Sequence, residues 1–275
     1  MPEGPEIRIA ADRIAKVLAG QRVLEVFLAP PGLRRFRPLL EGATVLAVET
    51  RGKAMLTRFD NGLTLYSHNQ LYGRWYVRAP GELPNTSRAL RVALHTVAGS
   101  ALLYSATDIE VLDEPGLEAQ PFLRRIGPDI LDPQLRWQTL ASRLAEKRFR
   151  GRSLAGLYLD QAFVAGIGNY LRSEILFFAA LAHTDRPVDL SRAERQRLAR
   201  QTLAVSRRSY ETRGITNTPS RVRARKAAGD TRRGAYRFAV FARDGQPCDA
   251  CGTAIGRADA GSRRIYFCPQ CQGEP

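Results

Sequence analysis

The chain has 275 residues, of which 42 are Lys or Arg and 27 are Asp or Glu, so its formal net charge is +15. Hydrophobic residues make up 44% of it, which supplies a core for one large domain or two to three smaller ones. A basic globular chain most often binds a polyanion, and the absence of any apolar run of about 18 residues excludes a membrane helix. We therefore predict a folded cytoplasmic protein with no membrane partner.

The first dozen residues carry the first chemical signal. A small Pro2 after Met1 favours removal of the initiator, which would leave a secondary amine beside the carboxylate of Glu3. An α-amine titrates near about 7.7 to 8, so part of it is unprotonated at neutral pH and attacks carbonyl-like carbons to give a Schiff base. The pair predicts attack at a sugar C1′ followed by elimination, with Pro2 as nucleophile and Glu3 as proton-transfer group.

The same residues also have a purely structural interpretation. Pro5 suits the first turn of a helix, and acidic residues are favoured there by the helix dipole. Apolar residues recur at helical spacing from Ile7 to Leu18, and Gly20 ends the run. We therefore predict a helix that packs against a core, whether or not the amine is a nucleophile.

Short β-rich runs follow this helix and predict strands at residues 23–28, 44–48, 54–59 and 63–67. Asp60-Asn61-Gly62 marks a hairpin turn between the last two, and a second hairpin joins residues 90–96 to 102–105. Residues 1–130 are predicted to form a β-sandwich or flattened barrel preceded by one helix.

Two stretches within the predicted sandwich stand out. Lys53 follows Gly52 at the entrance of a strand, where a lysine is usually a solvated edge charge. Residues 67–73 have the sequence Ser-His-Asn-Gln-Leu-Tyr-Gly. They form either an ordinary turn or a wedge, because an amide, an aliphatic and an aromatic side chain beside a glycine suit insertion into a base stack.

After Pro133 the apolar pattern becomes helical, and helices are predicted at residues 134–147, 154–159, 169–180 and 191–210. The last begins with a capping box of Ser191 and Glu194. Gly-Ile-Gly-Asn at 166–169 opens the third helix and exposes backbone N–H groups, and Asn169 is expected to cap the helix and donate a hydrogen bond. These groups suit a phosphate oxygen, although glycines before a helix often only make the turn.

The C-terminal part begins with a strongly basic segment and ends with a cysteine pattern. Residues 214–235 are predicted to be a flexible basic linker, whose simplest role is solubility. The spacing Cys248-x-x-Cys251 and Cys268-x-x-Cys271 uses every cysteine and predicts one structural Zn²⁺, since two disulfides would need an oxidising compartment. Four thiolates leave no open position, so the metal would organise a hairpin that presents Arg263 to phosphate.

Four motifs in this order resemble the formamidopyrimidine-DNA glycosylase and endonuclease VIII family over essentially the whole chain. They are Pro-Glu-Gly-Pro-Glu at 2–6, Arg-Gly-Lys at 51–53, Asp-Gln-x-x-x-Ala-Gly-Ile-Gly-Asn at 160–169 and the four-cysteine ribbon. The resemblance implies an α+β, multidomain fold: an N-terminal β-sandwich with one N-terminal helix, a helix-two-turn-helix domain and a C-terminal four-cysteine zinc finger. The expected boundaries are 1–130 for the catalytic sandwich, 131–213 for the helical domain, 214–235 for the linker and 236–275 for the zinc finger.

The resemblance also implies a function and residue roles. The expected activity is that of a bifunctional DNA glycosylase and AP lyase of base excision repair, which forms a Schiff base at Pro2 and nicks the strand by β,δ-elimination. Glu3 would transfer protons, Lys53 would bind phosphate and assist elimination, and Arg263 would take part in the second elimination. The expected DNA contacts are Gln70, Leu71 and Tyr72, which would fill the gap left by a flipped nucleotide, together with Arg125, Asn169 and Arg263.

The choice of damaged base is also suggested by the resemblance. Ser-His-Asn-Gln-Leu-Tyr-Gly after Tyr66 resembles the endonuclease VIII branch, which prefers oxidised pyrimidines, and the Gly-Gly-Thr-Thr-Leu loop of the purine-preferring branch is missing after Gly214. The alternatives are a formamidopyrimidine or 8-oxoguanine glycosylase, a lyase for abasic sites only, and a non-catalytic zinc-ribbon nucleic-acid binder. We expect a bacterial cytoplasmic monomer whose partner is damaged double-stranded DNA.

Overall fold

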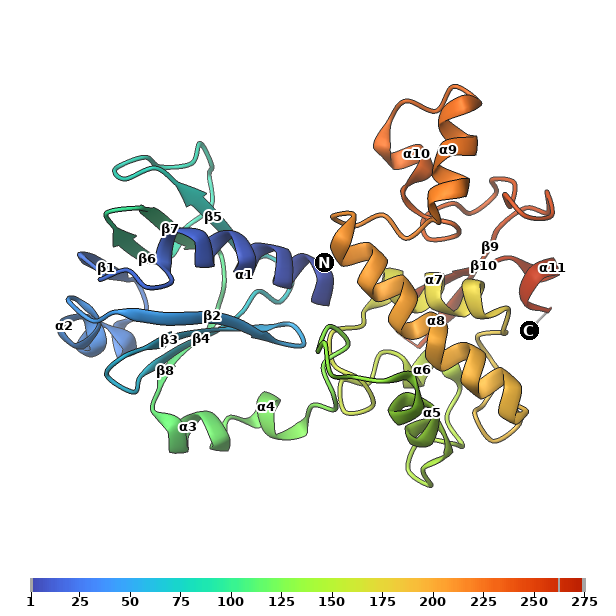
Figure 1. The fold of residues 1–275 in the computed structure, drawn as a ribbon, viewed down its shortest axis with the longest axis horizontal. Coiled ribbons are helices and arrows are strands. Elements are labelled where there is room, and N and C mark those ends of the chain that lie inside the picture. The colour runs from blue at the N-terminus through green and yellow to red at the C-terminus, as the bar shows by residue number, and fades with distance from the viewer. Residues whose placement is uncertain (1, 262, 274–275) are drawn as a thin grey trace. The chain divides into compact units, whose positions relative to one another are not determined.

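The computed structural model describes residues 2–261 and 263–273 (Figure 1). The chain divides into two compact units, residues 1–125 and residues 126–275. Two expectations, the removal of Met1 and the part played by Ser262 in the ribbon turn, lie outside the described residues.

The first unit combines one long helix with two antiparallel sheets and short helices. Its elements are α1 (Gly4–Leu18), β1 (Glu25–Leu28), a 3₁₀ turn (Pro31–Phe36), α2 (Arg37–Leu40), β2 (Val45–Arg51), β3 (Ala54–Phe59), β4 (Thr64–His68), β5 (Arg74–Arg78), β6 (Leu90–Thr96), β7 (Gly99–Tyr104), β8 (Asp108–Leu112), α3 (Glu114–Ala119) and α4 (Pro121–Arg125).

The two sheets have the strand orders β1-β6-β7-β5 and β2-β3-β4-β8, and every neighbouring pair is antiparallel. Helix α1 contacts β2 of one sheet and β7 of the other. Its apolar face, with Ile7 and Ile14, joins Leu94 of one sheet and Leu65 of the other in a single core. The predicted sandwich with one N-terminal helix is confirmed, because this face buries its apolar residues at a spacing of three and four.

The predicted strands and both hairpins of this unit are also present, within a few residues of their expected ends. Strands β5 and β8 were not predicted. Each lies at the edge of its sheet, where one side of the strand has no neighbour. Polar residues are tolerated there, so the apolar signal of an edge strand is weak; Asp108 and Glu110 alternate with apolar residues in β8.

The second unit is helical and ends in a small hairpin. Its elements are α5 (Trp137–Ala145), α6 (Leu154–Leu157), α7 (Asn169–Ala179), α8 (Arg192–Glu211), α9 (Pro219–Ala227), α10 (Arg233–Arg237), β9 (Gly256–Ala260), β10 (Arg263–Phe267) and α11 (Pro269–Gln272).

Helix α7 is central to this unit, since it packs against α8 on one side and β10 on another. The four predicted helices are confirmed as α5 to α8, although α5 begins at Trp137, three residues later than expected. The predicted capping box is present: the Ser191 hydroxyl accepts from the Glu194 N–H at 3.2 Å, and the Glu194 carboxylate accepts from the Ser191 N–H at 2.8 Å.

The segment 214–235 differs from the flexible linker that its composition suggested, because it contains α9 and the start of α10. The local cause is a helix start made by Thr218 and Pro219. The Thr218 hydroxyl accepts from the Arg221 N–H at 3.4 Å, and Pro219 occupies the first helical position, where its missing N–H costs nothing. The prediction of a flexible linker rested on the many basic residues and overlooked the helix start at Thr218 and Pro219.

Within the described ranges, no helix has both the length and the apolar character that crossing a bilayer requires.

Candidate active site and nucleic-acid interface

Glu3 is buried although it carries a carboxylate, with 3% of its surface exposed, whereas Pro2 is half-buried. Glu3 is the N-cap of α1 and forms a capping box with Glu6, whose carboxylate accepts from the Glu3 N–H at 3.1 Å. The helix therefore fixes the position of Glu3 through its backbone and its side chain at once. The predicted capped helix is confirmed, and the cap places a buried carboxylate beside Pro2. The nucleophilic role of Pro2 stays a prediction.

Lys53 occupies the tip of a hairpin. Arg51 pairs with Ala54, so Gly52 and Lys53 are the two central residues of the β2–β3 turn. Gly52 has a φ of 62°, as the first central residue of a type II′ turn requires, and a residue with a Cβ would be strained there. The glycine thus serves the turn, and the turn holds Lys53 at the end of the sheet near His68, which follows from their electrostatic interaction.

His68 is held in a neutral state by its surroundings. Burial first, and the nearby positive charge of Lys53 second, lower the pKa of His68 to about 4. Its Nδ1 atom accepts from the Gln70 N–H at 3.1 Å, and its ring meets the edge of Phe122 with the centroids 5.1 Å apart. The histidine therefore links the end of β4 to the loop that follows and to α4.

We expect this histidine to make the protein less stable in acid. In the unfolded chain it would take up a proton near pH 6.5, but in the folded chain only near pH 4, so the unfolding free energy falls as pH falls through that window. The loss is up to about 3 kcal/mol, at about 1.4 kcal/mol per pKa unit. Melting temperatures of the wild type and His68→Asn between pH 7 and 5 test this. The variant should show the shallower decline, and two parallel curves would contradict the assignment.

Residues 69–73 form a tight loop that turns two large side chains outward. Leu71 is 52% exposed and Tyr72 is 66% exposed. The Gly73 N–H donates to the Asn69 carbonyl at 2.7 Å, and a Cβ on Gly73 would lie 2.6 Å from that same oxygen, so the closure needs glycine. Gln70 has a φ of 48°, and its amide oxygen accepts from the Thr107 hydroxyl at 3.0 Å. The loop therefore presents two large side chains to solvent, and their insertion into a base stack stays a prediction.

The Asp-Gln motif holds the Gly-rich loop before α7 from within. The Gln161 amide nitrogen donates to the carbonyls of Leu159 and Ile167 at 3.0 and 2.9 Å, and its oxygen accepts from the Gly166 N–H at 3.0 Å. One side chain thus ties both ends of the loop and its glycine. The loop is fixed before any ligand arrives, which lowers the entropy cost of binding one.

Asn169 is not the cap that the sequence suggested. The N-cap of α7 is Gly168, and Asn169 is the first helical residue. Its side-chain oxygen accepts from the Arg172 guanidinium at 2.7 Å. Because the oxygen is occupied, the amide group is oriented by Arg172, and its nitrogen is the part suited to donate to a phosphate.

Arg172 also joins this helix start to the ribbon hairpin. It is completely buried, and it donates to the Ala155 carbonyl at 2.9 Å and to the Arg264 carbonyl at 3.0 Å. Asn169 and the first residues of β10 therefore share one guanidinium, which brings Asn169 and the neighbour of Arg263 together. The side chain of Arg263 itself is exposed.

Glu174 is a second buried charge that sequence reasoning did not single out. Its carboxylate accepts from the N–H groups of Ala239 and Val240 at 2.8 Å and of Phe241 at 2.9 Å, and from the hydroxyl of Thr216. A signal existed: Arg-Ser-Glu interrupts an otherwise apolar run in α7, and all three residues are fully buried. Polar residues in such a place need partners, so they indicate tertiary hydrogen bonds.

The four cysteines meet as predicted. Their sulfur atoms lie within 4.8 Å of one another, with Sγ–Sγ distances of 3.9 Å for Cys248 and Cys271 and 3.4 Å for Cys251 and Cys268. A disulfide would need about 2.05 Å, whereas four sulfurs about 2.3 Å from a tetrahedral metal lie about 3.8 Å apart. The cluster is therefore able to hold a metal, and β9 and β10 between its two halves form the expected hairpin.

The chain matches the N-terminal domain of formamidopyrimidine-DNA glycosylase over residues 1–108 and the H2TH domain of that enzyme over residues 126–220. It belongs to the formamidopyrimidine-DNA glycosylase family. The α+β fold expected from the sequence, with its helical domain and four-cysteine cluster, is the fold of this family.

Relatives of this glycosylase family match the chain from end to end. Endonuclease 8 of an Escherichia coli strain is 50% identical over 272 residues, 99% of this chain and 100% of the relative. Endonuclease 8 of Shigella sonnei is 48% identical over 273 residues, with the same coverage. Full-length likeness of this kind places the chain with the endonuclease VIII members of the family.

Two solved structures of the glycosylase family give the same fold. The MutM (Fpg) protein of Thermus thermophilus superposes with a TM-score of 0.80 and 29% identity, covering 100% of both chains. Lactococcus lactis Fpg in complex with N7-benzyl-Fapy-dG-containing DNA gives a TM-score of 0.81 over 99% of this chain and 100% of that one. At 20% identity the second likeness shows the shared fold alone.

The structure places the predicted catalytic and DNA-contact residues in both units. In the first unit, Glu3 lies at the start of α1, Lys53 at the β2–β3 turn, and Gln70 to Tyr72 in the loop after β4. Arg125 ends α4, and its Nε donates to the Pro121 carbonyl at 2.9 Å. In the second unit, Asn169 begins α7 and Arg263 begins β10. Their roles in catalysis and DNA contact remain proposals.

Proposed function

We propose that Pro2 and Glu3 carry out the chemistry of this protein, which is a bifunctional DNA glycosylase and AP lyase of base excision repair. It acts on oxidised pyrimidines, as endonuclease VIII does. The observation that carries this function is the likeness to Endonuclease 8 over the whole length of both chains. The burial of the Glu3 carboxylate at the start of α1 supports its assignment to proton transfer.

The proposed reaction begins at the amine of Pro2. After removal of Met1, the nitrogen attacks C1′ of the damaged nucleotide, the glycosidic bond breaks, and the base leaves with the proton that the Pro2 nitrogen gives up. Glu3 gives a proton to the sugar ring oxygen as the ring opens, so that C1′ becomes an iminium carbon bonded to Pro2. The iminium withdraws electrons from C2′, which then loses a proton, and the 3′ phosphate departs. A second elimination releases the 5′ phosphate, and we assign Lys53 and Arg263 to these steps.

The metal we propose for the cysteine cluster is a single Zn²⁺. All four donors are sulfur, their spacing fits a tetrahedral site, and no ligand position is left open for substrate. When bound, the metal supplies folding energy to the hairpin and takes no part in bond breaking. Two buried residues of α7 hold this region: Arg172 bonds β10 of the ribbon, and Glu174 bonds residues 239–241, which lead into it.

Damaged double-stranded DNA is the proposed partner, bound by a monomer. Structures of Lactococcus lactis Fpg with DNA containing an abasic site have the same fold. In this chain, Leu71 and Tyr72 are the wedge candidates because they are exposed apolar side chains on a rigid loop. Asn169 supports a phosphate contact because Arg172 orients its amide.

Trapping with borohydride tests the nucleophile. An iminium between Pro2 and C1′ is reduced to a stable bond, so a covalent complex with thymine glycol DNA should appear on a denaturing gel and, after digestion, as a modified Pro2 peptide in a mass spectrum. The matched sample is the same chain with Met1 retained, which has no free Pro2 amine. The assignment would be contradicted if the wild type with Met1 removed gave no adduct. It would also be contradicted if the adduct mapped to a lysine.

A further inference from the structure

The basic insert, which we define as residues 214–237, is folded although it buries little. Helix α9 has nine residues, none of them buried. Isolated helices shorter than about 12–15 residues are marginal in water, so α9 needs contacts from elsewhere. Two of these are visible at its start, where the Arg221 guanidinium lies 5.1 Å from the ring centroid of Phe177 and 5.4 Å from that of Phe178.

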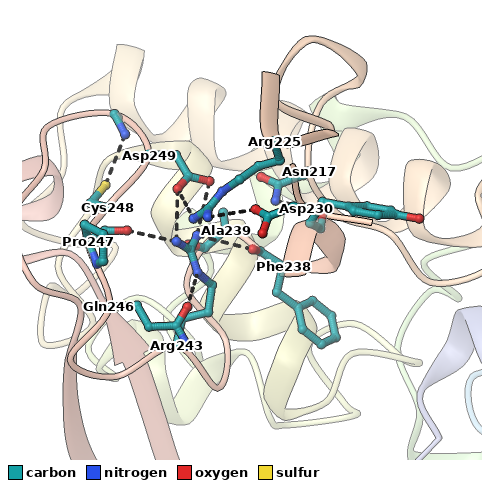
Figure 2. Close-up of polar contacts among 12 residues, drawn as sticks. Asn217, Arg225, Asp230, Phe238, Ala239, Arg243, Gln246, Pro247, Cys248 and Asp249 are labelled. Carbon is teal, nitrogen blue, oxygen red and sulfur yellow. Dashed lines mark hydrogen bonds and ion pairs between the residues drawn. The ribbon is translucent and has the colours of Figure 1, made fainter. Parts of the chain in front are cut away.

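Its second anchor is an ion-pair chain that ends in the cysteine cluster. Arg225 of α9 pairs with Asp230 at 3.1 Å and with Asp249. Asp249 also accepts from both terminal nitrogens of Arg243, at 2.9 and 3.2 Å (Figure 2). Asp249 lies between Cys248 and Cys251 in the sequence, so a residue of the first cysteine pair holds α9 directly.

Arg243 fixes the position of the Asp249 carboxylate. Only 5% of the Arg243 side chain is exposed, and its guanidinium also donates to the carbonyls of Ala239 at 2.6 Å and Pro247 at 2.8 Å. Asp249 has 14% of its side chain exposed, so the contact to Arg225 is shielded from water. Shielded ion pairs with several hydrogen bonds depend on each partner, because removing one leaves a charge that is buried and unpaired.

The insert is not held by close apolar packing where it faces the segment that leads into the ribbon. A cavity of about 730 Å³ separates part of the insert from the segment leading into the ribbon, and its lining includes Asp230, Ala235, Phe238 and Phe241. The insert is therefore not close-packed against a core on that side. Together with the contacts of Arg221 and Thr216 to α7, the ion pairs described above hold it in position.

The insert carries three exposed positive charges, one of which, Lys226, lies 5.0 Å from the ring centroid of Tyr236. Arg223, Lys226 and Arg232 are exposed, and in the parts of the chain that the structure covers none of them lies within ion-pair distance of a carboxylate. Both nearby acidic residues, Asp230 and Asp249, are engaged by Arg225. Exposed guanidinium and ammonium groups of this kind suit the phosphates of a nucleic-acid backbone.

We propose that α9 and α10 form an additional surface for the phosphate backbone of duplex DNA, docked on the cysteine cluster through Arg225, Asp249 and Arg243. Arg223, Lys226 and Arg232 make the phosphate contacts, and Asp249 is the positioning residue. The inference rests on the proposed function in that its partner is duplex DNA, but it concerns binding that does not need a damaged base.

The test compares affinity for an undamaged duplex at several salt concentrations, by fluorescence anisotropy. Asp249→Asn should weaken binding and lower the slope of log K against log salt, although it makes the protein more positive. Asp244→Asn is the matched control: it changes net charge equally and removes an exposed ion pair with Arg257 in the same ribbon. For both variants, zinc content and the rate of tryptic cleavage after Arg223 and Lys226 are also measured. We expect both variants to keep their metal, and only Asp249→Asn to be cleaved faster at these two sites.

A triple variant tests the contact residues directly. Arg223→Gln, Lys226→Gln and Arg232→Gln together should lower the salt slope by up to about 2.7, at about 0.9 per lost phosphate contact. The control removes three exposed basic residues of the first unit, Arg13, Lys16 and Arg34, and should keep more of the slope. A triple variant with the wild-type slope overturns the surface, and an Asp249→Asn variant with the wild-type slope and tryptic pattern overturns the anchor.

Borohydride trapping on the same preparations separates this inference from the proposed function. If the wild type forms the adduct but the triple variant binds like the wild type, this inference alone fails. If the salt slope depends on the insert but no adduct forms, the proposed chemistry fails and the surface stands.

Discussion

Glu3→Gln lowers the rate of base release from a thymine glycol duplex by about 10²- to 10⁴-fold and leaves DNA binding close to that of the wild type. This is the range that a general acid or base contributes. The amide keeps the size of the side chain and its ability to accept a hydrogen bond at the start of α1, but it is neither acidic nor basic enough to transfer a proton. Single-turnover kinetics and equilibrium binding on the same duplex measure the two quantities.

The control for this variant is Glu6→Gln, since Glu6 is the other member of the capping box. It makes the same chemical change within one helical turn. If Glu3 acts by proton transfer, the Glu6 variant should keep most of its activity and lose only a fraction of a kcal/mol of stability. Equal losses of affinity and activity in Glu3→Gln would mean that the residue is structural.

Cys268→Ser and Arg263→Ala should both lose DNA affinity and strand cleavage at an abasic site, for one shared reason. Cys268 is fully buried, and the ribbon folds with its metal, so its replacement releases the hairpin that carries Arg263. The sandwich unit should stay folded, because its core does not include the cysteines. The double variant should be little worse than Cys268→Ser, since the two changes remove the same contact.

Arg264→Ala is the matched control for this pair. Arg264 is also exposed, and its backbone carbonyl accepts from Arg172, a contact that replacement of the side chain leaves in place. Zinc content by mass spectrometry and nicking rates are measured for all variants. An Arg263→Ala protein that cleaves like the wild type beside an inactive Cys268→Ser protein would show that the ribbon serves stability or another contact.

The features that could be predicted from the sequence are those set by neighbouring residues. Helix α1, the hairpin at 60–62, the Ser191 capping box and the four-cysteine cluster each depend on a local pattern, and each is present. The family resemblance added the order of the domains. The edge strands β5 and β8 were not predicted, because a strand at the exposed edge of a sheet does not require apolar residues.

The features that could not be predicted depend on contacts between distant residues. The cap expected of Asn169 was wrong because its side-chain oxygen is taken by Arg172, which is itself held by the Arg264 carbonyl, 92 residues further along the chain. The insert looked unstructured because its composition gives no sign of Asp249, the partner that holds α9. Gln161 was visible as part of a motif, but its three hydrogen bonds follow only from the folded loop.

Glu174 has a consequence for how the insert tolerates changes in its length. Its carboxylate holds Thr216 at one end of the insert and Ala239 at the other, and the Thr216 N–H also donates to the Arg237 carbonyl at 2.9 Å. The two ends are therefore joined at the base, whatever lies between them. Doubling the length of a loop closed in this way costs only about 0.6 kcal/mol in entropy. A change in the length of the chain between these ends therefore leaves the base closed, provided that Arg221 keeps its contact with Phe177 and Arg225 its pair with Asp249.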